Sequence, residues 1–144
     1  MTETTDLIRT IFEQTRTIAV VGASANPARP SHYVGEFLRE NGYRVIGVNP
    51  GLAGQTLYGE PVFATLGDIP FDIDMIDIFR RSEDVEPVVD EALARFPDLG
   101  TVWMQIGVVN EAAADKARAA GKMVVMDRCP KVELPRLRAT LRTG

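Results

Sequence analysis

The stretch TIAVVGASANPARPS, residues 17–31, joins a short β-branched run to a loop of glycine, small residues and proline. The run is apolar almost throughout, which is typical of a strand covered on both faces of a parallel sheet. Further runs of this character follow at residues 43–48, 75–79, 101–106 and 122–126. We therefore predict five buried strands.

Helical patterns separate these runs. The first has an apolar stripe at Val34, Phe37 and Leu38. Ser31 is its predicted N-cap, and Gly42 is the residue predicted to end it.

Further helices are expected over residues 85–96 and 111–120, the latter capped by Asn110 and followed by Gly121. A leading helix contains residues 7–12, and a closing one covers residues 133–141. Between the second and third strands, residues 57–63 are a candidate edge strand, since Pro61 would interrupt a central one.

The alternation of strands and helices predicts βαβ units and a parallel sheet. A length of 144 residues corresponds to one domain, since domains contain roughly 100–200 residues. We therefore expect a single α/β domain over residues 1–144. It has a Rossmann-like, doubly wound and mainly parallel sheet with helices on both faces.

The composition excludes several classes of protein. The 16 basic and 20 acidic side chains give a net charge of −4, which argues against a nucleic-acid partner. No apolar run reaches the roughly 18 residues of a membrane span. The single cysteine, Cys129, cannot form an internal disulfide, which fits a reducing cytoplasm. We expect a cytoplasmic protein with no membrane partner, and its protein partner is left open.

The loop over residues 22–31 is a candidate phosphate site, because ligands of open α/β sheets bind beyond the carboxyl ends of the strands. Gly22 allows close approach of the backbone, and the hydroxyls of Ser24 and Ser31 can donate to phosphate. Arg29 can bind a phosphate in bidentate fashion. The alternative is that these residue types serve only the turn.

A nicotinamide dinucleotide is the first ligand to weigh against this loop. That cofactor calls for G-x-G-x-x-G after the first strand and an acidic residue ~20 positions later. Here residues 22–24 read GAS, and Asn49 and Pro50 follow the second strand. Both departures count against NAD. An NAD(P)-binding oxidoreductase or redox sensor is kept as an alternative.

Five motifs at the strand ends carry a family resemblance: VGAS at 21–24, VNP at 48–50, FRRS at 79–82, WMQIG at 103–107 and MDRC at 126–129. Together with Pro27, Arg29 and Ser31, this ordered set resembles the stand-alone coenzyme A-binding domain family. Those proteins are similar to the N-terminal CoA-binding domain of the succinyl-CoA synthetase α subunit. The resemblance extends over about residues 12 to 134.

The resemblance implies a site for coenzyme A. The first loop would hold the phosphates, Asn49 and Pro50 would shape the wall beside the adenosine, and Gln105 with Gly107 would line the floor under the pantetheine arm. Phe79 and the arginines that follow it would flank the nucleotide. The full set of candidate binding residues is Gly22, Ala23, Ser24, Pro27, Arg29, Ser31, His32, Asn49, Pro50, Phe79, Arg80, Arg81, Gln105, Gly107 and Arg128.

Residues suited to catalysis are few. His32 is interpreted as a first-turn residue that hydrogen-bonds locally or touches a phosphate, in preference to a general base. Cys129 is interpreted as a small packing residue, with a redox-active thiol that forms a mixed disulfide with CoA as the alternative. Three carboxylates lie at or beside the start of a predicted strand: Asp72, Asp74 and Asp77. We interpret them as solvent-exposed side chains and not as a metal site.

We therefore expect a non-catalytic protein that binds CoA or an acyl-CoA for sensing, storage or delivery. The ligases whose CoA-binding domain this chain resembles use a phosphorylated histidine in a second domain. His32 does not match the position of that histidine. A non-catalytic subunit of an acyl-CoA ligase is the further alternative.

Overall fold

A sheet of five parallel strands forms the centre of the computed structural model, which describes residues 2–143. Neighbouring strands are parallel throughout this sheet. The predicted strands are confirmed, although most of the apolar runs extend one or two residues beyond the paired segment. In spatial order the strands are β2 (Arg44–Val48), β1 (Thr17–Val21), β5 (Met75–Ile78), β6 (Thr101–Met104) and β7 (Met123–Val125).

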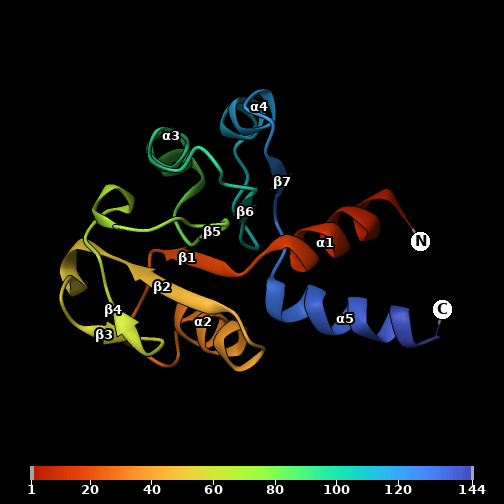
Figure 1. The fold of residues 1–144 in the computed structure, drawn as a ribbon, viewed down its shortest axis with the longest axis horizontal. Helices are drawn as coiled ribbons and strands as arrows, with labels where there is room; N and C mark the ends of the chain where they lie inside the picture. The colour runs from red at the N-terminus through yellow and green to blue at the C-terminus, as the bar shows by residue number, and fades with distance from the viewer. Residues whose placement is uncertain (1, 144) are drawn as a thin grey trace.

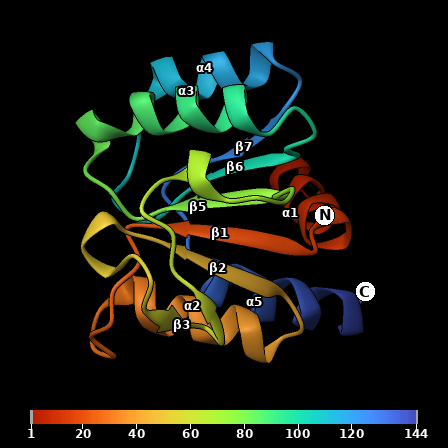
Figure 2. The same cartoon turned by 60° about the vertical axis from the view of Figure 1, so that its left-hand side comes forward.

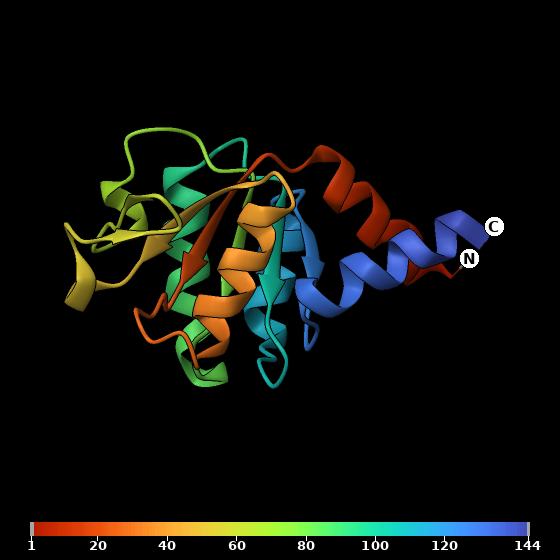
Figure 3. The ribbon, with the colours of Figure 1, turned by 90° about the horizontal axis from the view of Figure 1, so that it is seen from below.

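Helices cover both faces of the sheet. Figure 2 shows α3 (Val85–Arg95) and α4 (Glu111–Ala119) over one face, and α2 (Pro30–Glu40) and α5 (Pro130–Thr143) over the other. The leading helix, α1 (Glu3–Gln14), packs beside α5, and the two extend together past the sheet (Figure 3). The predicted α/β, doubly wound fold class is confirmed.

Each face of the sheet has its own apolar core. The face under α3 and α4 buries Ala19, Ile46 and Ile76. The face under α1, α2 and α5 buries Val20 and Trp103, which follow the alternation of side chains along a strand. The Trp103 side chain is fully buried, and its indole nitrogen donates to the carbonyl oxygen of Arg128 at 2.7 Å. Trp103 is therefore a core residue of this face.

Strand β1 lies at the switch in strand order. The chain passes from β1 to β2 on one side and then returns to β5 on the other side of β1 (Figure 1). The helices and loops that leave β1 and β5 therefore diverge to opposite faces. This leaves a crevice at the carboxyl ends of β1, β2 and β5, where ligands of such sheets bind.

The predicted ends of α4 are close to those observed, whereas α5 begins at Pro130 rather than at residue 133 and the start of α2 also differs. Asn110 caps α4, its side chain accepting from the Ala113 amide at 2.9 Å, and Gly121 follows α4 at a positive φ of 82°. The prediction that Ser31 caps α2 is wrong. Arg29 occupies the N-cap and Pro30 is the first helical residue, because the fixed φ of proline suits that position.

The predicted edge strand over residues 57–63 is replaced by a small separate hairpin. Strands β3 (Thr56–Leu57) and β4 (Glu60–Pro61) pair antiparallel, and beyond them Phe63 forms one parallel bridge to Val48 at the end of β2. Short 3₁₀ turns at residues 50–52, 66–68 and 82–84 complete the loops. Tyr58 turns the hairpin at a φ of 55°, and its hydroxyl donates to the carbonyl oxygen of Ser31 at 2.6 Å.

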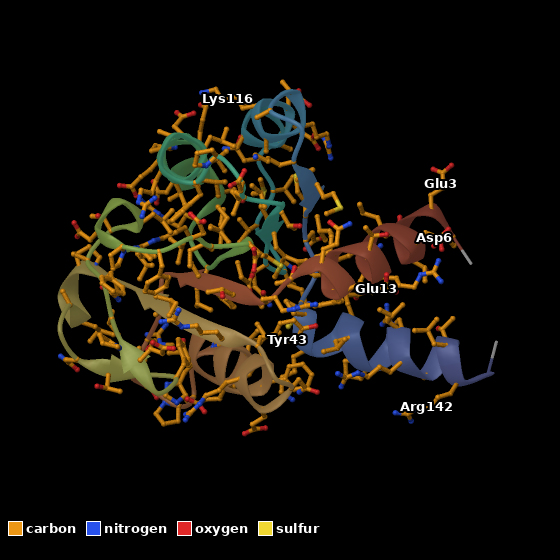
Figure 4. The ribbon with its side chains drawn as sticks, viewed as in Figure 1. Glu3, Asp6, Glu13, Tyr43, Lys116 and Arg142 are labelled. Atoms are coloured by element: carbon orange, nitrogen blue, oxygen red, sulfur yellow. The ribbon has the colours of Figure 1, made fainter. Side chains whose placement is uncertain are left out.

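Charged contacts join α3 and α4, the two helices on one face of the sheet. The Lys116 ammonium on α4 lies 2.9 Å from Glu86 and 3.1 Å from Asp90, both on α3. Figure 4 labels Lys116 on α4. None of the helices formed by residues 2–143 has the length and apolar character required to cross a membrane.

Candidate functional site

A cleft of about 550 Å³ lies at the switch in strand order. We call it the nucleotide cleft. It is of the size typical for small-molecule sites, roughly 300–1,000 Å³. Its walls come from the loop after β1, the start of α2, the turn after β2 and the end of β5. The candidate residues that line it are Gly22, Ala23, Ser24, Arg29, Ser31, Asn49 and Phe79.

Gly22 fixes how the first loop leaves the sheet. Its φ is +90°, and a Cβ built on it would lie 2.2 Å from the carbonyl oxygen of Phe79. The amides of Gly22 and Ala23 both donate to the carbonyl oxygen of Val48, at 3.0 and 3.3 Å. These two N–H groups therefore hold the loop to β2. The loop contributes Ser24 and Arg29 to the lining of the cleft, and the start of α2 contributes Ser31.

The loop is held further by its own side chains. Ser24 Oγ accepts from the Asn26 amide at 3.1 Å, and Asn26 Oδ1 accepts from the Ala28 amide at 3.0 Å. His32 Nδ1 lies 2.9 Å from the carbonyl oxygen of Ser24, which is the local hydrogen bond expected of it. Pro27 is exposed and does not line the nucleotide cleft. The loop is thus braced before any ligand arrives.

Asn49 ties the second wall to the first. Its Nδ2 donates to the carbonyl oxygen of Ala23 at 2.7 Å, and its Oδ1 accepts from the Gly51 amide at 2.9 Å. Both ends of the amide are used within the protein, so Asn49 positions the wall. Pro50 begins the 3₁₀ turn and is exposed, while Leu52 supplies the apolar surface facing the cleft.

The four candidate arginines fall into two groups. Arg81 lies 2.9 Å from Asp84 and 3.6 Å from Glu83, and Arg128 lies 3.3 Å from Glu133. Arg29 and Arg80 form no ion pair with any residue of the described range 2–143. Arg29, which lines the nucleotide cleft, is therefore the better placed cation for a phosphate.

A second cavity of about 420 Å³ adjoins the first, since Pro30 lines both. We call it the thiol pocket. It lies between the start of α2, the end of β6 and the start of α5, and Gln105, Ile106 and Cys129 line it. Gly107 lies beside it in the loop after β6, where its amide donates to Asp127 Oδ1 at 2.7 Å. A smaller cavity of about 110 Å³ lies between α1 and α5, and the candidate residue Arg128 lines this cavity and neither of the other two.

Sequence reasoning missed the role of Asp127. It adopts a φ of 59°, and its bond to Gly107 joins the loops after β6 and β7 under the thiol pocket. Aspartate tolerates the left-handed region better than most residues. Its position directly after the last predicted strand, at the edge where the loops meet, could have indicated this role.

The prediction of a solvated group of aspartates is wrong for Asp77. Asp74 accepts from the Arg16 and Thr17 amides at 3.0 and 2.9 Å. Asp77 is fully buried on β5, and neither carboxyl oxygen has a hydrogen-bond partner among the described residues. Burial raises the pKa of Asp77 well above its ordinary value, because an ion is poorly solvated there. The side chain lies between Val20 and Trp103 in the sheet register.

The strand order, the glycine-led loop after β1 and the cleft at the switch point define an α/β protein of the Rossmann-like class. The chain belongs to the CoA-binding domain family, whose model, described as "CoA binding domain", matches residues 16–135. The resemblance found in the sequence motifs is therefore confirmed.

Three relatives are similar to this chain over most of its length. The Bacillus subtilis (strain 168) protein YneT is 38% identical over 125 residues, which cover 87% of this chain and 90% of YneT. A Thermus thermophilus structure described as cell-free ID.343 superposes with a TM-score of 0.86 at 41% identity, covering 92% of this chain and 98% of the other. A Pyrococcus horikoshii OT3 protein superposes with a TM-score of 0.85 at 33% identity, covering 92% and 91%.

Proposed function

We propose that the protein binds coenzyme A or an acyl-CoA in the nucleotide cleft and does not turn it over. The observation that carries this proposal is the placement of Arg29, which has no ion-pair partner within residues 2–143, on a braced loop at the switch in strand order. Membership of the CoA-binding domain family supports the choice of ligand. A role in sensing, storage or delivery follows from binding without turnover.

The two cavities suit the two halves of this ligand. CoA carries a pyrophosphate and a 3′-phosphate at its nucleotide end and an uncharged arm that ends in a thiol. Arg29 lines the nucleotide cleft and Arg80 follows β5 beside Phe79, so both can attract phosphate. Pro30 lines both cavities, and the lining of the thiol pocket includes the apolar side chains of Val34 and Ile106.

The lining of the nucleotide cleft supports binding more than catalysis. It is made of glycine, alanine, serine, proline, asparagine, leucine, phenylalanine and one arginine. Such groups bind and orient a ligand, whereas acid–base chemistry needs a positioned titratable group near neutral pKa. The one histidine, His32, is engaged with the carbonyl oxygen of Ser24.

Substitution of Arg29 tests the proposal. Arg29→Ala should weaken CoA binding by about 1.5–3 kcal/mol, the range for hydrogen bonds to charged groups. That corresponds to a rise in Kd of roughly 10- to 150-fold, measured by calorimetric titration. Arg81→Ala should lose less, since Asp84 and Glu83 already neutralise that side chain.

Arg118→Ala is the matched control, because Arg118 is an exposed arginine on α4, which covers the opposite face of the sheet from α2. Its variant should bind CoA like the original chain. Equal affinity of the Arg29→Ala and Arg118→Ala variants would remove Arg29 from the site.

A further inference from the structure

The thiol pocket contains a buried acceptor without a donor. Gln105 is 6% exposed, and its Oε1 has no hydrogen-bond partner among the described residues. Leaving a buried acceptor unsatisfied costs about 1–3 kcal/mol. Gln105 follows the end of β6 and lines the pocket. The oxygen itself is enclosed, so an amide N–H of a ligand in the pocket can satisfy it once the Gln105 amide turns toward the pocket.

Cys129 lines the same pocket as Gln105. The residue is 6% exposed, and it directly precedes α5, where its carbonyl oxygen accepts from the Val132 and Glu133 amides at 2.9 Å. The first N–H groups of a helix and its dipole favour negative charge at this end. Lys131 also lines the pocket and adds a positive side chain. Disulfide exchange proceeds through the thiolate, and Cys129 has both the start of a helix and a lysine beside it.

We propose that the thiol pocket holds the sulfur end of CoA against Cys129, so that the two sulfurs form a mixed disulfide. This inference rests on the proposed function. The arm of CoA carries two amide groups before its thiol, so one N–H can reach Gln105 Oε1 while the terminal sulfur meets Cys129. Access to Cys129 is through the pocket, so the exchange selects a disulfide that the nucleotide cleft has already bound.

The reaction is thiol–disulfide exchange with CoA disulfide as the co-reactant. The Cys129 thiolate attacks one sulfur of CoA disulfide, a Cys129–CoA sulfur–sulfur bond forms, and the original sulfur–sulfur bond breaks. The second CoA leaves as a thiolate and takes up the proton that Cys129 released. The total number of disulfide bonds is unchanged, and a free thiol reverses the step.

Intact-mass spectrometry of the full chain tests this inference. Incubation with CoA disulfide should add the mass of one CoA less two hydrogens, and peptide mapping should place the adduct on Cys129. Hydroxyethyl disulfide, which lacks the nucleotide, is the comparison reagent. At micromolar reagent, CoA disulfide should react roughly tenfold faster or more, because a bound reagent is held at an effective concentration of the order of millimolar.

Two variants serve as controls. Arg29→Ala should slow the reaction with CoA disulfide and leave that with hydroxyethyl disulfide unchanged. The double variant Cys129→Ser with Ala112→Cys moves the thiol to an exposed position on α4. Its rate with CoA disulfide should rise linearly with reagent, whereas the original chain should saturate and be inhibited by free CoA.

The outcomes separate the inference from the function on which it rests. If calorimetry shows that CoA binds but Cys129 reacts with CoA disulfide no faster than the relocated cysteine does, the mixed disulfide is wrong and the binding function stands. If CoA does not bind at all, the proposed function fails and this inference fails with it.

Discussion

Gly22→Ala tests whether the first loop needs its close approach to β5. The new methyl group would impose two separate penalties. The φ of +90° is unfavourable for a residue with a Cβ, by about 1–2 kcal/mol. The Cβ would also lie 2.2 Å from the carbonyl oxygen of Phe79 and 3.1 Å from its carbonyl carbon.

The second penalty comes from rigid backbone. Phe79 donates its amide to the carbonyl oxygen of Val21 at 2.8 Å, so it cannot move away without straining the end of the sheet. Overpacking of this kind costs about 1–3 kcal/mol. The total loss in the free energy of unfolding is therefore about 2–5 kcal/mol.

Gly121→Ala is the matched control for the first penalty. Gly121 has a φ of +82°, and a Cβ there would have no neighbour within 4 Å. Its loss should be about 1–2 kcal/mol, from φ alone. Urea unfolding of both variants gives the difference, and calorimetry should show weakened CoA binding in Gly22→Ala alone. Equal losses of stability in the two variants would refute the argument from the Phe79 contact.

Two further predictions concern buried polar groups. Asp77 has a raised pKa in the folded protein, so above about pH 4 the folded state holds a proton that the unfolded chain has released, and stability falls as pH rises toward the folded pKa. Asp77→Asn should remove this fall, and an unchanged pH profile of urea unfolding would contradict the burial argument. Tyr58→Phe removes the 2.6 Å bond to the Ser31 carbonyl and should reduce stability by about 1–3 kcal/mol; thermal unfolding checks this, and a loss near zero would show that the bond contributes little.

The fold was readable from sequence because its signals are local. The apolar run before Gly22 marks β1, and Asn110 caps α4 as its side-chain chemistry predicts. Ser31 shows where local reasoning fails. Its hydroxyl suits an N-cap. Pro30, however, fits the first helical position, so the helix starts nearer the N-terminus than Ser31 predicts.

The sequence indicated where in the fold the candidate site lies, but it did not show which side chains contact one another there. Strand ends indicated the loops that form the nucleotide cleft, and Arg29 lies there as expected. Arg81 forms ion pairs with Glu83 and Asp84, which are two and three residues further along the chain. The sequence alone did not show whether the Arg81 side chain turns to these acids or to a ligand. Asp77 was read as solvated because carboxylates are mostly exposed. Its burial follows from the central place of β5 in the sheet, which is a property of the whole fold.

Comparative titration of CoA, dephospho-CoA, NAD and NADP against the full chain tests the central claim most directly. We expect CoA to bind, and we expect dephospho-CoA, which lacks the 3′-phosphate, to bind more weakly. We also expect NAD and NADP to bind weakest of the four. Tighter binding of NAD or NADP than of CoA would contradict that claim.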